Sequence, residues 1–551
     1  MTHTSPAVAE PEAKSDRTVL YLFIGLMITM LLAALNQTVL STALPTIVGE
    51  LDGVDQMTWV ITGYILASTI VMPVYGRISD ILGRKPVLLV AIVLFIAGSV
   101  VGALAGNIEI LIAARVLQGI GGGGLMILSQ AAIADVVPAR ERGKYMGAMG
   151  AVFAVASVAG PLLGGWLTEG PGWRWAFWMN VPLGLLAIAA CTVFLHLPKK
   201  EHAERPKLDY LGMALIAAAT TALVLVCTWG GSTYEWLSPQ IIGLSVATVI
   251  LAVAFCWAET KAVAPVIPLA LFRDRNFTLT TIAALMIGVG MFGAIGYMPT
   301  YIQMVTGASA TVAGLLMIPM MGGLLVASVA SGQAVTRTGK YKVFPIVGSA
   351  ILGLGLGLLS TLHVESPTWL LCTYLAVTGV GIGLSMQILT LIVQNSFPGR
   401  IVGTATAASN YFRQVGATLG SAIVGSVFAS RLITLLSEKM AGSGAAAGAG
   451  GDEFRKHLTP AGVSALPDAI REPIIHSYNE ALLPIFLFLV PLAVIAVIAL
   501  LFVEQKPLAT SVQDEITAES LAEGQLLEMV DDTAGPSAFR PDPDAGKTTR
   551  V

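Results

Sequence analysis

One short polar segment between two long apolar runs carries the residue types of a charge-pairing switch. It contains three cations, one carboxylate and two glycines, which are Gly76, Arg77, Asp80, Gly83, Arg84 and Lys85. The glycines permit the tight backbone of a short hairpin. Asp80 can pair with either arginine and so form a cluster that holds two parts of the molecule together. The alternative is a topology signal with solvated charges, but Lys and Arg alone would serve that purpose and Asp80 would add nothing.

A second polar group lies inside the apolar runs. Arg115 falls about five residues into its run, roughly 8 Å deep at the rise of a helix. A charge at such a depth is costly in a bilayer, so Arg115 either extends to the surface or faces a neighbour in the interior. The expected neighbour is Asn36. Asn36 and Gln37 are predicted to contact a polar cavity or to form interhelical hydrogen bonds.

Arg413 is another cation placed deep inside a run. It follows Gly403 by ten residues, roughly 15 Å along a helix, with no acid nearby in the sequence. We expect it to contact a cavity, a carbonyl or an anionic group of a substrate.

A substrate cavity needs apolar walls with a few polar groups. Methionine is adaptable and aromatic rings attract cations, so such residues on central runs are candidates, although each taken singly is more often a packing residue. The predicted cavity residues are Gln37, Tyr64, Phe153, Phe292, Tyr297, Met317, Gln387, Asn410, Tyr411 and Arg413.

The elements that position these residues follow from composition. Hydrophobic residues make up 55% of the 551 positions and charged residues only 12%, about half the share of a soluble protein. The mean hydropathy is +0.78. The chain is therefore predicted to be an all-α integral membrane protein. Apolar runs occur at 18–44, 57–75, 86–105, 110–133, 144–168, 174–196, 209–229, 240–259, 277–300, 310–332, 343–362, 368–394, 403–429 and 481–503.

The distribution of cations predicts the orientation. Of the 31 Lys and Arg residues, 23 fall in the termini and alternate loops of one side, whereas the short loops of the other side hold only Arg174. Short Lys- and Arg-rich loops stay inside, so both termini are predicted to be cytoplasmic.

An internal repeat is visible at a displacement of 256 residues. Gly76 and Gly83 match Gly332 and Gly339, while Thr336 takes the position of Asp80. Homologous halves are the usual construction of secondary transporters, with the substrate site at their interface. We therefore predict an N-terminal segment 1–17, a six-helix bundle 18–196, two inserted helices 209–259, a second six-helix bundle 277–503 with an extracytoplasmic loop 430–480, and an acidic tail 504–551.

The motifs also resemble a known family. The segment 76–85 resembles the loop motif of the major facilitator superfamily, and 115–119 resembles the helix-4 motif of its proton-coupled members. Ala159, Gly160 and Pro161 with Gly164 resemble the helix-5 motif of drug exporters. The segments 35–45 and 173–182 resemble the fourteen-helix drug:proton antiporters. The likeness covers about residues 18–505.

This resemblance implies a major facilitator fold and proton-driven export of amphipathic or cationic drugs across the cell membrane by alternating access. It also implies that Asp135 joins the cluster of Asp80. In the helix that holds Gly160 and Gly164, small residues favour close packing and Pro161 permits a bend. The expected partners are the substrate, protons and membrane lipids, and we expect a monomer.

Asn36 departs from the family, whose fourteen-helix members commonly carry Asp there. An amide cannot titrate, so the remaining titratable candidates are Asp80 and Asp135 on the inner side and His363 and Glu50 on the outer side. Alternatively, the chain exports an endogenous lipid or metabolite without conventional coupling. A membrane enzyme or signalling scaffold is disfavoured, because no nucleotide loop, metal set or nucleophile constellation is present. No cofactor, metal or nucleic acid is expected, and a gated channel is disfavoured by the two halves.

Overall fold

The computed structural model describes residues 16–51, 56–195, 208–231, 233–440, 462–463 and 466–510. Within these ranges thirteen helices are long and apolar enough to cross a membrane, and α14 (Val343–Leu359) is a shorter apolar helix. Each predicted apolar run falls on one of these spans. The predicted segment 1–17, apart from its last two residues, and the predicted tail beyond residue 510 lie outside the described residues.

The helices fall into two halves and an inserted pair. The N-terminal half contains α1 (Asp16–Glu50), α2 (Met57–Leu82), α3 (Arg84–Ala103), α4 (Ile108–Val136), α5 (Ala139–Glu169), α6 (Trp175–Trp178) and α7 (Asn180–Phe194). The inserted pair is α8 (Tyr210–Trp229) and α9 (Pro239–Glu259). The C-terminal half contains η2 (Leu269–Arg273), α10 (Arg275–Ile295), α11 (Met298–Thr306), α12 (Ala310–Leu316), α13 (Ile318–Thr338), α14, α15 (Thr368–Gln394), α16 (Val402–Met440) and α20 (Asp468–Leu501).

Local sequence sets several of the helix boundaries. Gly83 has φ of +91° between α2 and α3, a backbone conformation that favours glycine. The side chains of Asn107, Asp209, Ser238 and Asp274 each accept a backbone N–H at the start of α4, α8, α9 and α10. Such N-caps satisfy the orphan donors of a first helical turn.

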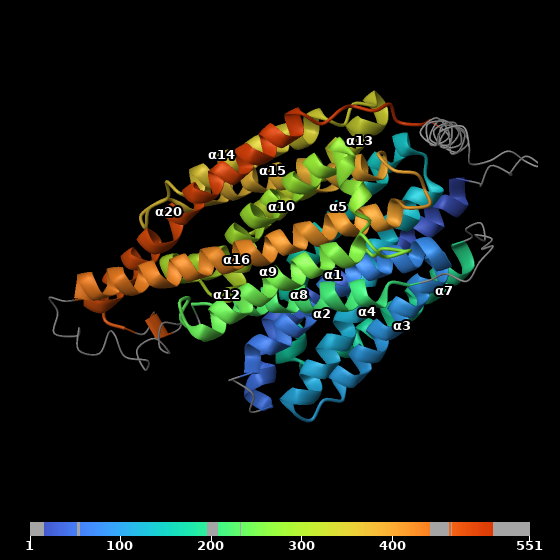
Figure 1. Ribbon diagram of the computed structural model, residues 1–551. Coiled ribbons are helices and arrows are strands. Elements are labelled where there is room, and N and C mark those ends of the chain that lie inside the picture. Colours follow the sequence, from blue (N-terminus) through green and yellow to red (C-terminus); the bar gives the residue numbers. More distant parts are fainter. Residues whose placement is uncertain are drawn as a thin grey trace, which may run out of the picture.

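The two halves repeat the same packing. In the N-terminal half α1 packs on α5, α2 on α4 and α3 on α4; in the C-terminal half α10 packs on α16, α13 on α15 and α14 on α15. Across the interface α2 packs on α16 and α5 on α13, which are again corresponding pairs. Figure 1 shows α14, α15 and α20 in the upper part of the view and α3, α4 and α7 in the lower part. The sequence repeat is thus a repeat of structure.

The inserted helix α8 contacts both halves. The Trp229 ring lies 6.0 Å from the Trp59 ring of α2, and the hydroxyls of Thr220 and Tyr411 of α16 are 2.8 Å apart. Helix α9 packs on α8.

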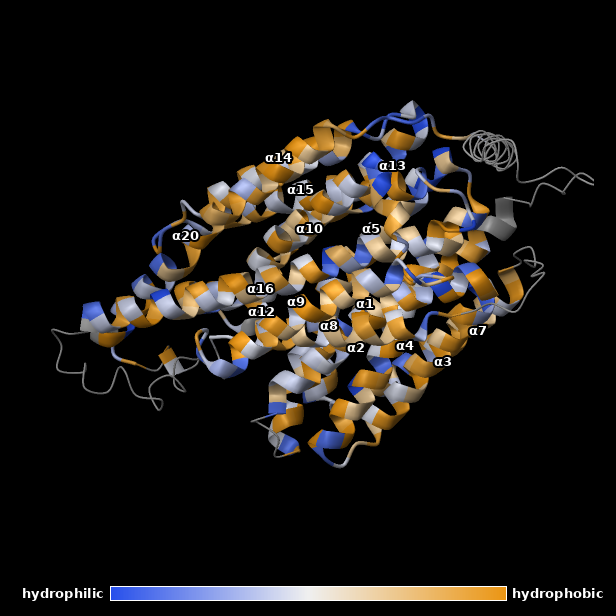
Figure 2. Ribbon diagram, viewed as in Figure 1, coloured by the Kyte–Doolittle hydropathy of each residue, from blue (hydrophilic) through white to orange (hydrophobic). Residues whose placement is uncertain are grey.

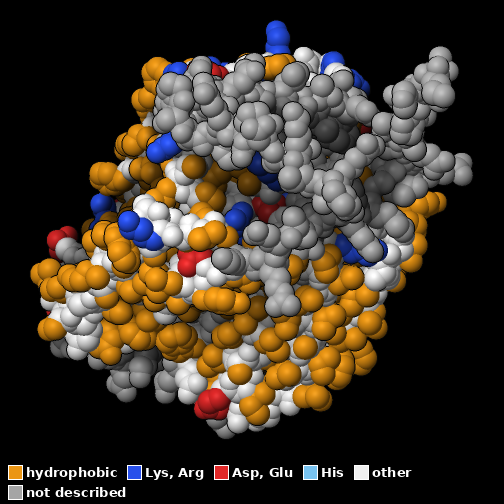
Figure 3. Space-filling view, turned by 45° about the vertical axis from the view of Figure 1, so that its right-hand side comes forward, with side chains coloured by type: hydrophobic (Ala, Val, Ile, Leu, Met, Phe, Trp, Pro, Cys, Tyr) orange, Lys and Arg blue, Asp and Glu red, His pale blue; other side chains and the backbone are white. Residues whose placement is uncertain are grey.

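The outer surface suits a lipid environment. Figure 2 shows hydrophobic residues along nearly every helix, and Figure 3 shows them over most of the lower part of the visible face, with Lys and Arg gathered higher. Large side chains such as Val90, Leu186, Val249 and Phe488 are more than half exposed. A protein with this surface buries it in a bilayer.

The predicted loop 430–480 is partly helical, which is a correction. Helix α16 continues to Met440 and α20 begins at Asp468, and residues 441–461 lie outside the described part of the chain. Polar contacts hold these extensions together: Lys439 Nζ lies 2.7 Å from Glu480 Oε1, and Arg431 donates to the Glu480 carbonyl.

Candidate functional site

Asp80, Arg84 and Asp135 form one ion-pair cluster, called the Asp80 cluster below. Arg84 Nη1 lies 2.5 Å from Asp80 Oδ1, and Arg84 Nε lies 3.1 Å from Asp135 Oδ2. The side chains of Asp80 and Arg84 are 1% exposed. Arg84 Nη1 also donates to Ser79 Oγ at 2.7 Å. A buried pair of this kind persists only because each charge is met by partners.

The Asp80 cluster reaches across to the other half. Asp80 Oδ2 accepts the backbone N–H and the hydroxyl of Thr404, both at 2.6 Å, and Oδ1 accepts the N–H of Gly403 at 3.3 Å. These donors begin α16. The N-terminus of a helix has free N–H groups and a partial positive charge, so it binds a carboxylate well. Asp80 therefore joins the two halves at the end of the bundle that holds the α2–α3 turn, called the Gly83 end below.

The other two cations of the segment do not join the Asp80 cluster. Lys85 donates to the Thr192 carbonyl at 2.8 Å. Arg77 has a buried Nε without a hydrogen-bond partner, and its charge acts on Glu259 of α9. The prediction that Arg77 shares Asp80 with Arg84 is therefore not met in this structure.

The corresponding contact in the second copy of the motif is neutral. Thr336 Oγ1 accepts the backbone N–H of Lys144 at 3.1 Å, near the start of α5. Arg140 also donates to the carbonyls of Thr336 and Arg337 at 3.3 Å. The two contacts correspond in position but not in charge: the Thr336 hydroxyl contacts the first turns of α5, whereas the Asp80 carboxylate contacts the first turn of α16.

Amide side chains make further contacts between the halves. Gln130 of α4 accepts two hydrogen bonds at 3.1 Å, one at its carbonyl from Gln394 and one at its side chain from Asn410. Ser328 donates to the Gly147 carbonyl at 3.2 Å. Gln130 and Thr404 were not predicted to join the halves. The available sequence signal is that each is a polar residue inside an apolar run.

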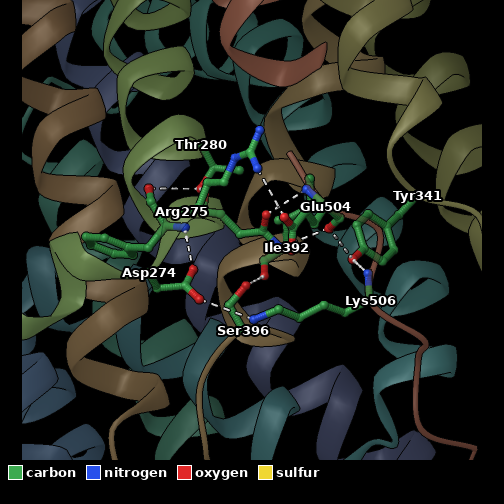
Figure 4. Close-up of polar contacts among 10 residues, drawn as sticks. Asp274, Arg275, Thr280, Tyr341, Ile392, Ser396, Glu504 and Lys506 are labelled. Atoms are coloured by element: carbon green, nitrogen blue, oxygen red, sulfur yellow. Dashed lines mark hydrogen bonds and ion pairs between the residues drawn. The ribbon is translucent and has the colours of Figure 1, made fainter. Parts of the chain in front are cut away.

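The segment that follows α20 packs on the start of α10, and Figure 4 shows its Glu504 and Lys506 beside Arg275 and Asp274. Glu504 exchanges two hydrogen bonds with Asn276 and pairs with Arg275 at 3.1 Å, and Lys506 pairs with Asp274 at 3.2 Å. Burial raises the pKa of Tyr341, which lies beside this segment and donates to the Glu504 carbonyl.

This segment also reaches the N-terminal half, because the N–H of Arg140 donates to the Ala509 carbonyl at 3.1 Å. The first residues of the predicted tail are therefore part of the packed molecule.

Arg115 lies in the interior of the N-terminal half and is 2% exposed. Its guanidinium lies 4.3 Å from the Tyr64 ring centroid, donates to the Val60 carbonyl at 3.2 Å and donates to Gln118 Oε1 at 2.8 Å. Of the two readings of Arg115, the structure supports the interior one. Tyr64, predicted to line a cavity, instead covers this cation.

Asn36 lies at the other end of the same polar network. Its Oδ1 accepts from Gln118 Nε2 at 3.3 Å and from Asn180 Nδ2 at 2.9 Å, while its Nδ2 is buried without a partner. Ser99 accepts from the same two amides. Asn36 thus makes interhelical hydrogen bonds in this structure. It is joined to Arg115 through Gln118, which sequence analysis did not single out.

The helix with the drug-exporter motif packs tightly on α1. A Cβ on Gly160 would overlap Thr38, and a Cβ on Gly164 would overlap the Val39 carbonyl. Helix α5 continues without a break through Pro161. The structure therefore shows the close-packing role of these glycines.

The remaining predicted cavity residues do not gather in one place. Tyr411 contacts α8 through Thr220 rather than a central cavity, which is a correction, and Tyr297 donates to the Ser421 carbonyl at 2.9 Å. Met317 and Phe292 pack in the C-terminal core, and Phe153 packs against the α1–α5 contact. Gln37 is exposed, and Gln387 is buried with an unpartnered Oε1.

Arg413 lies on α16 between residues that contact the N-terminal half and residues that contact α10. Asn410, one turn before it, bonds to Gln130 of the N-terminal half, whereas Gly416, one turn after it, packs on Leu285 of α10. Arg413 itself is half-buried, and within the described residues no ion pair or side-chain hydrogen bond is formed by it. It is eleven residues beyond Val402, about 16 Å along the helix.

Two repeated six-helix halves, in contact through the Asp80 cluster, are the construction of a secondary transporter. The family model of the Major Facilitator Superfamily matches residues 26–421, and the chain belongs to that family. It is a multi-pass membrane transporter and not an enzyme.

Among curated proteins, an uncharacterised MFS-type transporter of Mycobacterium tuberculosis is 40% identical over 505 residues, which cover 91% of this chain and 72% of that protein. Multidrug resistance protein 3 of Bacillus subtilis is 32% identical, over 90% of this chain and 96% of its own length. The multidrug transporter protein MdtP of the same species is 36% identical over 78% of each chain. The crystal structure of a human organic anion transporter superimposes with a TM-score of 0.59 at 15% identity, covering 89% of this chain and 100% of that chain.

Proposed function

We propose that this transporter exports amphipathic compounds across the cell membrane by alternating access, driven by inward movement of protons. The similarity to two multidrug transporters of Bacillus subtilis supports the substrate class. In this proposal the Gly83 end and both termini face the cytoplasm, because short loops rich in Lys and Arg stay inside.

The single observation that carries the proposal is the bond between Asp80 and the start of α16. It joins the halves at the Gly83 end, so this conformation is closed to the cytoplasm. Opening that side requires the carboxylate to leave Gly403 and Thr404 while it stays paired with Arg84. The Asp80 cluster is therefore a contact that exists in one state and is released in the other, which is what alternating access needs.

Transport into proteoliposomes tests the proposal. The purified protein is reconstituted in lipid vesicles, and ethidium movement is followed by fluorescence with and without an imposed pH gradient. We expect ethidium to accumulate only when the gradient is present and to equilibrate when a protonophore dissipates it. Substrate movement that ignores the gradient would exclude proton antiport and favour uncoupled export of an endogenous lipid or metabolite.

Arg413 favours a second substrate class, amphipathic compounds with an acidic group. Its charge is not balanced by an ion pair among the described residues, and it lies deep between the halves. A half-buried cation without a counter-ion is stabilised when a carboxylate or phosphate binds to it.

Arg413→Gln should therefore weaken transport of an anionic fluorescent dye by about tenfold, the loss of one charge-assisted hydrogen bond, while ethidium transport changes by less than about twofold. The measured quantity is Km for each dye. The same quantity in Arg275→Gln, a substitution at an exposed position, is the control. An equal loss for both dyes would show that Arg413 has no preference for anions.

A further inference from the structure

Two acidic side chains at the Gly83 end of the inserted pair remain unexplained by the contacts between the halves. Asp209 caps α8, and Glu259 is the last residue of α9. A Cβ on Gly212 would touch both Asp209 Oδ2 and Glu259 Oε1, so these two oxygens lie within about 5 Å of each other.

Each carboxylate has one satisfied oxygen and one oxygen without a partner. Asp209 Oδ1 accepts the N–H of Gly212 at 2.9 Å, and Glu259 Oε1 accepts the N–H of Val266 at 3.1 Å. Asp209 Oδ2 and Glu259 Oε2 are buried and have no hydrogen-bond partner, although the backbone N–H of Ile267 also acts on the Glu259 carboxylate. The Glu259 side chain belongs to a residue that is only 4% exposed.

Glu259 differs in this respect from the other buried carboxylate of the described residues. Asp80 is met by Arg84 and by three donors of α16, so its negative charge is balanced. Among the described residues, the charged side chains that act on Glu259 are Asp209 at the start of α8, which repels it, and Arg77 of α2, which attracts it. Arg77 forms no ion pair with Glu259 in this part of the chain.

The buried Glu259 carboxylate and the partly buried Asp209 carboxylate repel each other at this separation unless one of them is protonated or a cation lies between them. We infer that Asp209 and Glu259 form a proton-binding site, which takes one proton from the water at the Gly83 end. The proton binds to a free carboxylate oxygen and changes the charge of the pair from −2 to −1. No other bond forms or breaks.

The position of the pair gives this proton a consequence for transport. The charge of Arg77 on α2 acts on Glu259, and Arg77 precedes Asp80 by three residues, or about one helical turn. Helix α8 also contacts both halves through Trp229 and Thr220. The charge of the pair therefore determines the electrostatic attraction on Arg77. Protonation from the cytoplasm weakens this attraction and so acts on α2, the helix that carries Asp80. This step deepens the proposed function, on which it rests, and provides the titratable group that Asn36 lacks.

Infrared spectroscopy of the full-length protein in lipid tests the site without any transport. At about pH 7, where exposed carboxyl groups are ionised, we expect the wild-type spectrum to contain the carbonyl stretch of a protonated carboxylic acid. Glu259→Gln should remove it and Asp209→Asn should lower it, whereas Glu169→Gln, at an exposed position, should leave it unchanged. Two variants are used so that the test survives the unfolding of one of them, which size-exclusion chromatography detects.

The same variants are then compared in the ethidium assay. The wild-type rate of ethidium transport should change by about tenfold per pH unit over the range in which the pair titrates. In Glu259→Gln the rate should change by less than about twofold per pH unit over the same range. An infrared band that survives in Glu259→Gln, or that is absent from the wild type because a metal cation bridges the pair, would overturn the inference. Absence of ethidium transport in the wild type would instead count against the proposed function, and the infrared result would still decide the proton site.

Discussion

Asp80→Asn is expected to reduce transport by at least about tenfold, because it removes the charge that joins the two halves. The amide has nearly the same shape, but its NH₂ group would face either Arg84 or the N–H groups of Gly403 and Thr404. Arg84 keeps Asp135 as a partner in the variant. What the closed state alone loses is the set of charge-assisted hydrogen bonds from Gly403 and Thr404, each worth about 1.5–3 kcal/mol. Losing two of them costs about 3 kcal/mol or more, which shifts the population of the two states by more than a hundredfold.

The expected structural consequence is separation of the halves at the Gly83 end. Spin labels at Glu141→Cys on α5 and Lys340→Cys beyond α13, both exposed positions, would report it as a longer distance in Asp80→Asn than in the otherwise identical parent. Arg275→Gln is the matched control, because it breaks a pair with Glu504 whose side chains are 56% and 65% exposed. Exposed pairs contribute about 0–1 kcal/mol, so this control should leave rate and distance nearly unchanged. An Asp80→Asn protein with wild-type rate and wild-type distance would refute the role of the cluster.

The fold was predictable because it depends on a strong and repeated signal. Fourteen apolar runs and a 256-residue repeat fix the number of helices and the two halves, and the paired glycines at Gly76 and Gly83 mark the turn. The bilayer forces each long apolar run into a helix whose backbone groups bond internally. The exception is the 430–480 segment, where α16 and α20 continue beyond their apolar residues because charged side chains such as Lys439 and Glu480 hold them together.

The contacts of single polar residues were less predictable. Arg77 was grouped with Arg84, yet the two have different partners, because Arg77 lies on α2 and Arg84 begins α3 beyond the Gly83 turn. It could not be foreseen that Asp80 would meet backbone N–H groups, since these carry no signature in the sequence. Tyr411 was also placed in a cavity, whereas the rotation of α16 turns that ring toward the inserted helix.

Asn36→Asp is expected to give the transporter a pH dependence at a site where the wild type has none. The Oδ1 of Asn36 accepts two amide hydrogen bonds, which an aspartate can keep. Its Nδ2 is a buried donor without a partner, and the substitution replaces that unsatisfied group with an acceptor. The new charge would lie in the same network as Arg115, whose described contacts include no carboxylate, so Coulomb attraction offsets part of the desolvation cost.

The measurement is the initial rate of ethidium transport against pH, together with Tm of the purified protein. Asn36→Asp should keep a Tm close to that of the wild type, and its rate should change by up to about tenfold per pH unit through the range in which the new carboxyl titrates. Asn180→Asp is the instructive comparison, because the Nδ2 of Asn180 donates to Asn36 and Ser99 and its loss places a carboxylate oxygen against the Asn36 oxygen. The same chemical change should thus be tolerated at one amide and destabilising at the other. Equal effects at both positions would mean that the direction of these hydrogen bonds does not stabilise the network. An unchanged pH profile for Asn36→Asp would mean that a carboxylate at position 36 does not couple protons to transport.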